Sequence, residues 1–306
     1  MRDYAIMIIQ PAAAMVLAPM LLGVINWVKA NFAGRRGQPL LQPYYDLWKL
    51  LHKSAVYSST TSWIFKAMPI VCLSAILLVT FIIPLGFGKT ILSFNGDLIL
   101  AAYLLGLIRF FIVIGALDTG SSFEGMGASR EVQFSALAEP AFFIAMAAMA
   151  RQTSSISFSN IFSAITPQMW ATNSATLLLV TAAIVIVLLA ENSRIPVDDP
   201  NTHLELTMIH EVMILDNSGP DFAFLLYSAA LKLWIFAAIL VGFILPMNVM
   251  PWQISIPVSI AAIFVVSILI GIVESCMARL RLVRVPHLLF TAVALAILAL
   301  IFTFRN

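Results

Sequence analysis

Charged residues are scarce in this chain. Only 10% of its 306 residues are Asp, Glu, Lys or Arg and 61% are hydrophobic, whereas an ordinary soluble domain is about 25% charged and about 45–50% apolar. A soluble domain could not keep so much apolar surface away from water, so the sequence predicts an integral membrane protein. The formal net charge of +2 provides no basic surface for nucleic acid, and we expect no nucleic-acid partner.

Cysteine is almost absent, which limits the chemistry that the chain can carry by itself. The two cysteines, Cys72 and Cys276, stand far apart in apolar segments, and no Cys-x-x-Cys motif occurs. Two cysteines cannot build a disulfide framework, an iron–sulfur cluster or a nickel–iron centre. The four histidines form no ligand-like set. We therefore expect no metal and no redox cofactor on this chain, so that any redox centres belong to partner subunits.

Long apolar runs make up most of the sequence. Eight of them are long enough to cross a membrane, since a helical span needs about 20 mostly apolar residues. None shows the alternating period of a barrel strand, so we expect helices throughout. The predicted fold is an all-α integral membrane protein with a single membrane domain, residues 1–306. Its spans are predicted near residues 5–29, 63–85, 96–117, 132–151, 174–192, 222–246, 254–278 and 285–304.

The basic residues are distributed unevenly between the two sets of connecting loops. One set holds eleven of the 17 Lys and Arg residues and the other holds four, while Arg109 and Lys232 lie inside spans. Because cytoplasmic loops carry the excess of Lys and Arg, both termini are predicted on the non-cytoplasmic side of the cell's inner membrane. The polar residues concentrate in the inner loops, so function is expected at the cytoplasmic face or just beneath it.

The first inner loop ends in a predicted amphipathic helix. Leu40, Tyr44, Leu47, Trp48 and Leu51 recur at helical spacing, and charged residues take the opposite face. An apolar stripe edged by Trp, Tyr and Lys is typical of a helix that lies in the plane of the membrane interface. Two interpretations stay open for this helix: a plain interfacial helix, or a lipid-facing wall of a hydrophobic cavity.

The second inner loop, 118–131, is rich in Gly, Ser and Asp, which predicts a tight, hydrogen-bonded turn. Its glycines do not form a phosphate-binding loop, because no strand precedes them and no Lys-Ser/Thr pair follows. The third inner loop, 193–221, has more acidic than basic residues, against the usual bias of inner loops. This composition indicates retained carboxylates, with a solvated acidic loop as the alternative. His203 and His210 in it lack the spacing of a zinc protease.

Among the ionisable residues within the predicted spans, where charges are costly and commonly mark pathways, we single out Arg109, Glu139, Lys232 and Glu274. Glu139 stands directly before a proline, which frees a backbone carbonyl nearby. It is the leading candidate for a proton relay, with a structural ion pair to Arg109 or Arg130 as the alternative. Arg109 and Lys232 are interpreted as pairing partners for buried carboxylates.

Two long motifs carry a resemblance to a known family. Residues 35–37 and 41–50 resemble the first-loop motif of the H-subunit family of respiratory complex I, and Glu191-x-x-Arg194-x-Pro196-x-Asp198 matches its third-loop motif. The resemblance runs over nearly the whole chain, including eight spans with both termini outside. Residues 117–123, 127–131 and 274–281 are similar to the branch of energy-converting membrane-bound hydrogenases, such as formate hydrogenlyase and hydrogenase-4.

The chain departs from many of these relatives after Asp198. Asn201 and His203 stand where the relatives have glutamates, whereas Glu205 is kept. Two acidic steps of the family's presumed acidic path are thus altered. His203 could still relay a proton, because histidine titrates near neutral pH.

The resemblance implies a membrane-anchoring and coupling subunit of a multisubunit ion-translocating oxidoreductase, not catalytic by itself. Hydrophilic cluster-bearing and large hydrogenase-like subunits are expected at the cytoplasmic face, where iron–sulfur clusters and a nickel–iron centre or quinone would reside, with antiporter-like subunits beside it in the membrane. The residues expected to relay protons or sodium ions are Glu139, Glu191, Asp198, Asp199, His203, Glu205, Glu211 and Glu274. Those expected to form a docking surface or a quinone-like cavity are Arg35, Arg36, Asp46, Asp118, Arg130, Glu131 and Arg194.

Two other functions stay open at this point. The chain could be the quinone-site subunit of a complex I-like NADH or ferredoxin dehydrogenase, since the interfacial helix with Arg35 and Arg36 fits a path for quinone. A stand-alone ion or solute transporter is the third possibility, because Glu139, Lys232 and Glu274 lie in spans. It ranks last, because the inner loops resemble docking surfaces and no pair of broken-helix repeats is evident.

Overall fold

The computed structural model describes residues 2–85, 88–199 and 209–305. Within these ranges eight helices are long and apolar enough to cross a membrane, which confirms the predicted number of spans and the helical fold. They are α1 (Arg2–Phe32), α3 (Trp63–Ile82), α4 (Asp97–Asp118), α5 (Ser122–Thr153), α8 (Ser174–Glu191), α9 (Gly219–Ile244), α10 (Trp252–Cys276) and α11 (Val285–Arg305). The shorter elements are α2 (Gln42–Leu51), α6 (Phe158–Ala164), α7 (Pro167–Thr172), η1 (Glu211–Ile214), η2 (Met247–Val249) and η3 (Leu282–Arg284).

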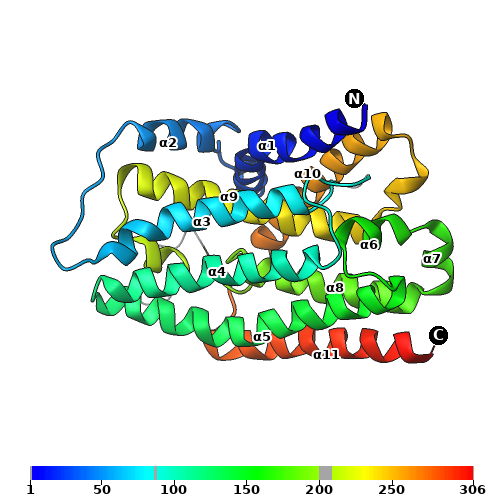
Figure 1. Cartoon of the computed structure of the whole chain (residues 1–306). Helices are drawn as coiled ribbons and strands as arrows, with labels where there is room; N and C mark the ends of the chain where they lie inside the picture. The colour runs from blue at the N-terminus through cyan, green and yellow to red at the C-terminus, as the bar shows by residue number, and fades with distance from the viewer. Residues whose placement is uncertain (1, 86–87, 200–208, 306) are drawn as a thin grey trace.

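The two chain ends lie at the same end of the bundle (Figure 1). An even number of spans requires this placement. The opposite end carries α2 and the connections that hold most of the polar residues, and we call it the loop end. Its connecting segments are residues 33–62, 119–121, 192–199, 209–218 and 277–284.

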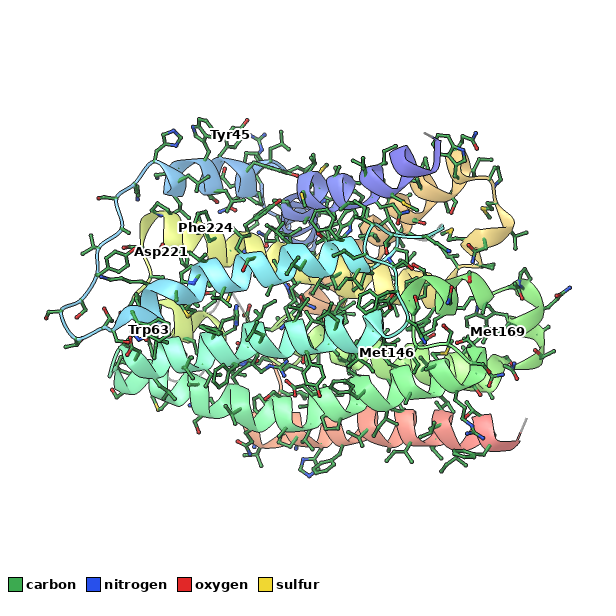
Figure 2. All side chains as sticks on the ribbon, in the orientation of Figure 1. Tyr45, Trp63, Met146, Met169, Asp221 and Phe224 are labelled. Carbon is green, nitrogen blue, oxygen red and sulfur yellow. The ribbon has the colours of Figure 1, made fainter. Side chains whose placement is uncertain are left out.

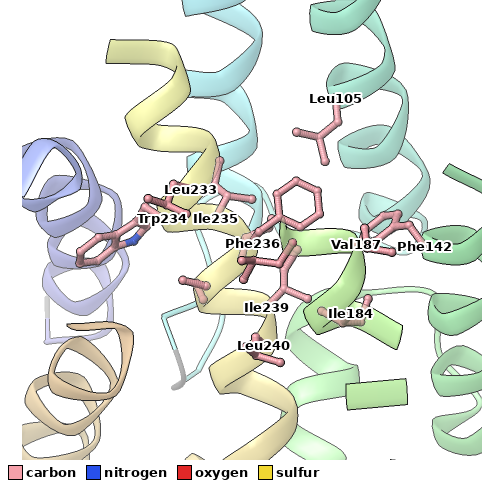
Figure 3. Packing of buried hydrophobic residues seen from close by; sticks show 14 of the residues in the cluster. Leu105, Phe142, Ile184, Val187, Leu233, Trp234, Ile235, Phe236, Ile239 and Leu240 are labelled. Carbon is pink, nitrogen blue, oxygen red and sulfur yellow. The ribbon is translucent and has the colours of Figure 1, made fainter. Parts of the chain in front are cut away.

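Helix α9 is the centre of the bundle. It packs against α1, α3, α8 and α10, and 72% of its most apolar stretch is buried. The ring of Phe236 on α9 meets that of Phe142 on α5 edge-on, with centroids 5.8 Å apart, and Leu105 of α4 lines the same crevice (Figure 3). A helix that is apolar on nearly all sides is buried on nearly all sides, so the sequence of α9 accounts for its central position.

Two hydroxyl groups tie α1 to its neighbours at a proline. Pro19 has no backbone N–H, so the carbonyl of Met15, four residues earlier, lacks its helical donor. The Tyr227 hydroxyl on α9 donates to that carbonyl at 2.8 Å. The Tyr44 hydroxyl on α2 donates to the adjacent carbonyl of Val16 at 2.5 Å. The proline therefore creates an acceptor inside the bundle, and α9 satisfies it.

The amphipathic helix predicted in the first inner loop is α2. It lies beside α1 and α9 at the loop end, yet none of its residues is fully buried. Trp48 is 67% exposed and Tyr45 60% exposed, and Figure 2 shows Tyr45 pointing away from the bundle. Large aromatic side chains presented in this way on a short helix are those expected at a membrane interface.

The second inner loop is shorter than predicted. Helix α5 begins at Ser122, so residues 122–131 are helical and the turn is confined to residues 119–121. Glu124, Gly127 and Ala128 are buried there, because this part of α5 packs against η1. A Cβ on Gly127 would lie 2.2 Å from Cγ1 of Val212. The glycine at that position therefore serves close helix packing, and composition alone wrongly extended the loop over it.

Gly127→Ala should lower the stability of the folded chain, whereas Gly125→Ala on the same helix should not. A Cβ at position 127 would also lie 2.9 Å from the backbone oxygen of Ile209, and overpacking of this kind costs about 1–3 kcal/mol. At position 125 the added Cβ has no neighbour within 4 Å, and alanine gains about 1 kcal/mol of helix propensity over glycine. Thermal unfolding midpoints of the full-length variants in detergent measure the difference. Equal midpoints for the two variants would contradict the close packing of α5 on η1.

Candidate functional site

A cavity of about 290 Å³ lies among the spans toward the loop end. We call it the charged cavity. Its apolar wall comes mainly from α4, α9 and the segment before α9, through Ile108, Ile112, Met213, Ile214, Phe222, Leu225, Leu226 and Leu233. Its polar wall is formed by Arg109, Glu131, Glu191, Asn192, Ser193, Arg194, Asp198, His210, Glu211, Asn217 and Lys232. The cavity therefore has one apolar wall and one polar wall, and the polar wall carries both positive and negative side chains.

Arg109 contacts more of the charged side chains around this cavity than any other cation in the described part of the chain. Its side chain is 10% exposed, and it reaches three carboxylates on two other helices. Its Nε donates to Glu131 at 3.2 Å, while its two terminal nitrogens bind Glu139 and Glu191. Glu191 in turn contacts the Nζ of Lys232 at 2.9 Å. The predicted role of Arg109 and Lys232 as pairing partners matches this geometry.

The Arg109 group has an unequal balance of charge. Three carboxylates, from Glu131, Glu139 and Glu191, share the two cations of Arg109 and Lys232. One negative charge is thus left over within the group when all three acids are ionised. The Glu139 side chain is the most exposed of the three, at 43%, so the surplus charge can be met by a partner at that position.

A second group of ion pairs surrounds Glu274 on α10. Its side chain is fully buried; one oxygen contacts Lys29 of α1 at 2.8 Å and the other contacts Arg194 at 3.4 Å. Lys29 also lies 4.0 Å from Asp199. The group links α1, α10 and the connection after α8, and it meets the charged cavity through Arg194.

Asp198 is held by a third set of contacts. Arg279 lies 2.9 Å from it, and the backbone N–H groups of Asp199 and Ile209 donate to its oxygens at 2.9 and 3.0 Å. Burial raises the pKa of Asp198 above its ordinary value, and the Arg279 guanidinium and the N–H donors oppose that rise. Asp198 lies in the first described part of the third inner loop, and its bond to Ile209 therefore connects that part to the second one.

Glu211 and His210 form the titratable part of the cavity outside the spans. Burial, with the nearby negative charge of Asp198, raises the pKa of Glu211 to about 7, and Arg194 opposes this rise. Burial lowers the pKa of His210, so its ring is neutral at neutral pH. A carboxyl group that titrates near neutral pH is suited to exchange protons with the other polar groups of the cavity wall.

The structure brings together only part of the predicted set. Glu131, Glu191, Asp198, Glu211 and Arg194 line the charged cavity. Glu139 joins it through Arg109, and Asp199 and Glu274 join it through the second ion-pair group.

The remaining predicted residues lie elsewhere. Arg35 and Arg36 are exposed, and exposed Asp46 accepts a hydrogen bond from Gln42 within α2. Asp118 accepts the Ser62 N–H at 2.7 Å at the loop end, and Arg130 is half-buried on α5. The predicted relay residues His203 and Glu205, like Asn201, lie outside the described residues.

Sequence reasoning missed several residues that contact or neighbour the candidate site. Lys29 and Arg279 are the cations that hold Glu274 and Asp198, but both stand in inner loops or at span ends, where positive charge is ordinary. Asn192 and Asn217 contribute buried amide oxygens without a hydrogen-bond donor in the described structure. Nothing in their local sequence distinguishes them from loop asparagines.

A redox metal centre finds no support in the described part of the chain. No group of three or more His, Cys, Asp or Glu side chains there is arranged to hold a metal ion. Cys72 is buried in α3 and Cys276 is exposed at the end of α10. The side chains present therefore do not fit an iron–sulfur cluster or a nickel–iron centre, which need several thiolates at one place.

Two proteins of Escherichia coli (strain K12) are similar to this chain over almost their whole length. It is 30% identical over 301 residues to formate hydrogenlyase subunit 4, and the match covers 96% of each chain. It is 29% identical over 299 residues to hydrogenase-4 component C, covering 96% of this chain and 93% of the relative. The hydrogenase branch indicated by the second-loop and seventh-span residues is thus the one in which these relatives fall.

The fold is also that of a solved membrane complex. A chain in the membrane-bound sulfane sulfur reductase, an archaeal respiratory membrane complex, superimposes with a TM-score of 0.84 over 99% of this chain and 100% of that chain. The two sequences are 22% identical, so this likeness shows the fold alone.

The family assignment rests on the whole chain. The sequence model of the NADH dehydrogenase family matches residues 4–304, which confirms the resemblance to the complex I family indicated by the loop motifs. Together with the two relatives and the eight span-length helices, this match shows that the chain belongs to the NADH dehydrogenase family of multi-pass membrane proteins.

Proposed function

We propose that this chain is the membrane-anchoring and coupling subunit of a hydrogenase-like, ion-translocating oxidoreductase complex. In this role it carries no redox centre, and its carboxylates link electron transfer in docked hydrophilic subunits to ion movement in the membrane. The names of the two relatives, a formate hydrogenlyase subunit and a hydrogenase-4 component, support the hydrogenase type.

The observation that carries the proposal is a continuous set of ion pairs from the charged cavity to the outer surface of α5. Glu191 lines the cavity, and Arg109 binds both Glu191 and Glu139. The Glu139 side chain is 43% exposed on a membrane-spanning helix. A carboxylate facing lipid is costly, so this face is suited to contact a membrane partner of the antiporter-like type.

Arg109 supplies the coupling in this scheme. Because one guanidinium is shared among Glu131, Glu139 and Glu191, a change in the charge near any of them alters how firmly Arg109 holds the other two. A change of charge at the cavity is therefore felt at Glu139 without movement of a proton through the arginine, which stays charged throughout.

Glu211 provides the exchange with the aqueous side. It lies in η1 at the loop end, its pKa is raised by burial to about 7, and it faces Asp198 and Arg194. We place the loop end in the cytoplasm, because it holds most of the Lys and Arg residues, and both termini on the opposite side of the inner membrane. The hydrophilic, cluster-bearing subunits would dock on this end.

A quinone-site role in a complex I-like dehydrogenase is the second candidate, and the shape of the cavity favours it. The apolar wall suits an isoprenoid-like body, while the Nε of Arg194, buried without an acceptor in the described structure, suits a carbonyl oxygen. Inhibitor-sensitive quinone reduction by the purified complex would support this role. Hydrogenase activity without quinone reduction would support the first proposal.

Glu139→Gln should uncouple ion translocation from electron transfer while the complex still assembles. The amide keeps the size of the side chain and can still contact Arg109, but it can neither ionise nor carry a proton, so ion translocation per electron should fall about tenfold or more. Electron transfer and recovery of the intact complex should stay near wild type. Lys89→Gln, which neutralises an exposed cation between α3 and α4 at the end that carries the termini, is the control and should keep full coupling. A Glu139→Gln complex that translocates ions normally would refute the relay role.

Glu211→Gln should remove a pH dependence of stability. The folded chain, with the pKa of Glu211 at about 7 against an ordinary 4.5, binds this proton more tightly than the unfolded chain. The stabilisation from that proton is complete below about pH 4.5 and is lost as the pH rises through about 7. Wild type should therefore lose more stability than the variant between about pH 5 and about pH 8. Thermal unfolding midpoints of both proteins at the two pH values measure this, and identical losses would show that Glu211 has no raised pKa.

A further inference from the structure

A narrow crevice lies between α4 and α5 on the side of the bundle, and Glu139 forms part of its wall. We call it the α4–α5 crevice. Its buried floor is formed by Leu105, Phe142 and Phe236, which come from α4, α5 and α9 (Figure 3). Phe143, which also lines it, is 40% exposed, so the crevice opens on the outer surface of the bundle. Its volume of about 20 Å³ is enough for one group of the size of a water molecule.

Gly106 keeps the crevice open on its α4 side. It lines the crevice, and a Cβ added at this position would meet no side chain and no other helix within 4 Å. Gly115 on the same helix is different, because a Cβ there would lie 2.4 Å from the sulfur of Met68. Glycine weakens a helix relative to alanine, and packing within this chain does not require it at position 106. Space for a group from outside the chain is the use that remains for this glycine.

Only one oxygen of Glu139 takes part in an ion pair. Its Oε1 contacts Arg109, and no ion pair within the described ranges involves Oε2. The side chain is 43% exposed although it stands in a membrane-spanning helix. Glu131, Glu139 and Glu191 moreover share only the two cations of Arg109 and Lys232. Glu139 is therefore the place where one more cation can reach this group from outside the bundle.

The crevice lies far from both ends of the helices that form it. Gly106 is nine residues from the first residue of α4 and twelve from the last, which is about 14 Å and about 18 Å along a helix. Because the hydrocarbon core of a bilayer is about 30 Å thick, lipid headgroups and bulk water lie beyond this depth. An exposed carboxylate would face hydrocarbon there, which is costly. A cation carried by a neighbouring membrane helix removes this cost, whereas the amine of a lipid headgroup does not reach so deep.

We infer that the α4–α5 crevice receives the ammonium group of a lysine from a membrane helix of a neighbouring subunit, and that this lysine pairs with Glu139. An ammonium is a compact charge on a slender, flexible stem, whereas a guanidinium is a broad plane. Lysine is therefore the cation that fits a crevice of this size, with its methylene groups against the apolar floor. The inference deepens the proposed function by naming the chemistry of the membrane partner, and it rests on that function only for the presence of such a subunit.

Dicyclohexylcarbodiimide, an apolar reagent that joins carboxyl groups to amines in contact with them, tests the inference in the purified complex in lipid vesicles. It activates the carboxyl group as an O-acylisourea; the lysine amine then displaces dicyclohexylurea and forms an amide bond. In wild type, mass spectrometry of peptides should find Glu139 joined to a lysine in a span-length apolar segment of another subunit. Glu139→Gln should lose this cross-link while the complex still assembles, because its amide oxygen still accepts from the ammonium but cannot be activated. Recovery of Glu139 without a cross-linked lysine, as the carbodiimide adduct or unmodified, would overturn the inference.

Two substitutions of Gly106 provide a second test. Gly106→Leu should leave the thermal unfolding midpoint of the full-length chain in detergent near that of wild type, because the added side chain enters open space. In the complex, the leucine fills the room that the ammonium needs, so recovery of the lysine-bearing subunit should fall about tenfold or more. Gly106→Ala, the smaller control, should keep that subunit. Equal recovery of the subunit in the two variants would contradict the inference.

The readouts also separate this inference from the proposed coupling role, since neither of them is ion translocation. A complex that shows the Glu139–lysine cross-link but translocates no ions would support the inference and refute the coupling role. A complex that translocates ions but lacks the cross-link would refute the inference alone.

Discussion

A single guanidinium holds the charged interior of this protein together. Arg109 binds three carboxylates, and Glu191 is shared further with Lys232. Without that guanidinium, two or three acids would face each other in a bundle that is otherwise apolar, and their ionised forms would be strongly disfavoured at that depth. The burial of Glu191 and the outward placement of Glu139 both depend on this one residue. It also makes the charges of the three acids interdependent, which an isolated ion pair would not do.

The architecture around Arg109 keeps its neighbours in place through contacts from several helices. Helix α9, buried on most sides, carries Lys232 and the apolar wall of the cavity. The second group, Lys29–Glu274–Arg194, fastens α1 and α10 to the connection after α8. Hydrogen bonds among the inner loops close the same end of the bundle. The buried carboxylates are therefore held by contacts from several helices beneath the connections of the loop end.

Much of the fold could be predicted from the sequence, because bilayer thickness imposes a length on every apolar run. The eight spans and a short helix in the first inner loop are confirmed, and their limits are mostly close to those predicted. The start of α5 was the main error. Glu124 and Gly127 have the composition of a turn, and only their packing against η1 makes the segment helical and buried. Such packing involves residues some 90 positions away along the chain and leaves no local signal.

The candidate site was predictable in its members but not in its pairing. Ionisable residues in spans are conspicuous, so Arg109, Glu139, Lys232 and Glu274 could be selected from the sequence alone. Which acid meets which cation depends on helix rotation and on loop geometry; hence Lys29 and Arg279 were missed, and Glu139 emerged as a partner of Arg109 with an exposed side.

The sharing of Arg109 among three carboxylates is the central claim, and Arg109→Lys tests it most directly. Lysine keeps the positive charge but lacks the planar fork that binds several carboxylates at once. The decisive measurement is the number of ions translocated per electron by the intact complex in vesicles. If Arg109 couples the cavity to Glu139, the variant should assemble and transfer electrons while translocation collapses. An unchanged ratio in an assembled, active variant would show that a positive charge alone suffices and would contradict the claim.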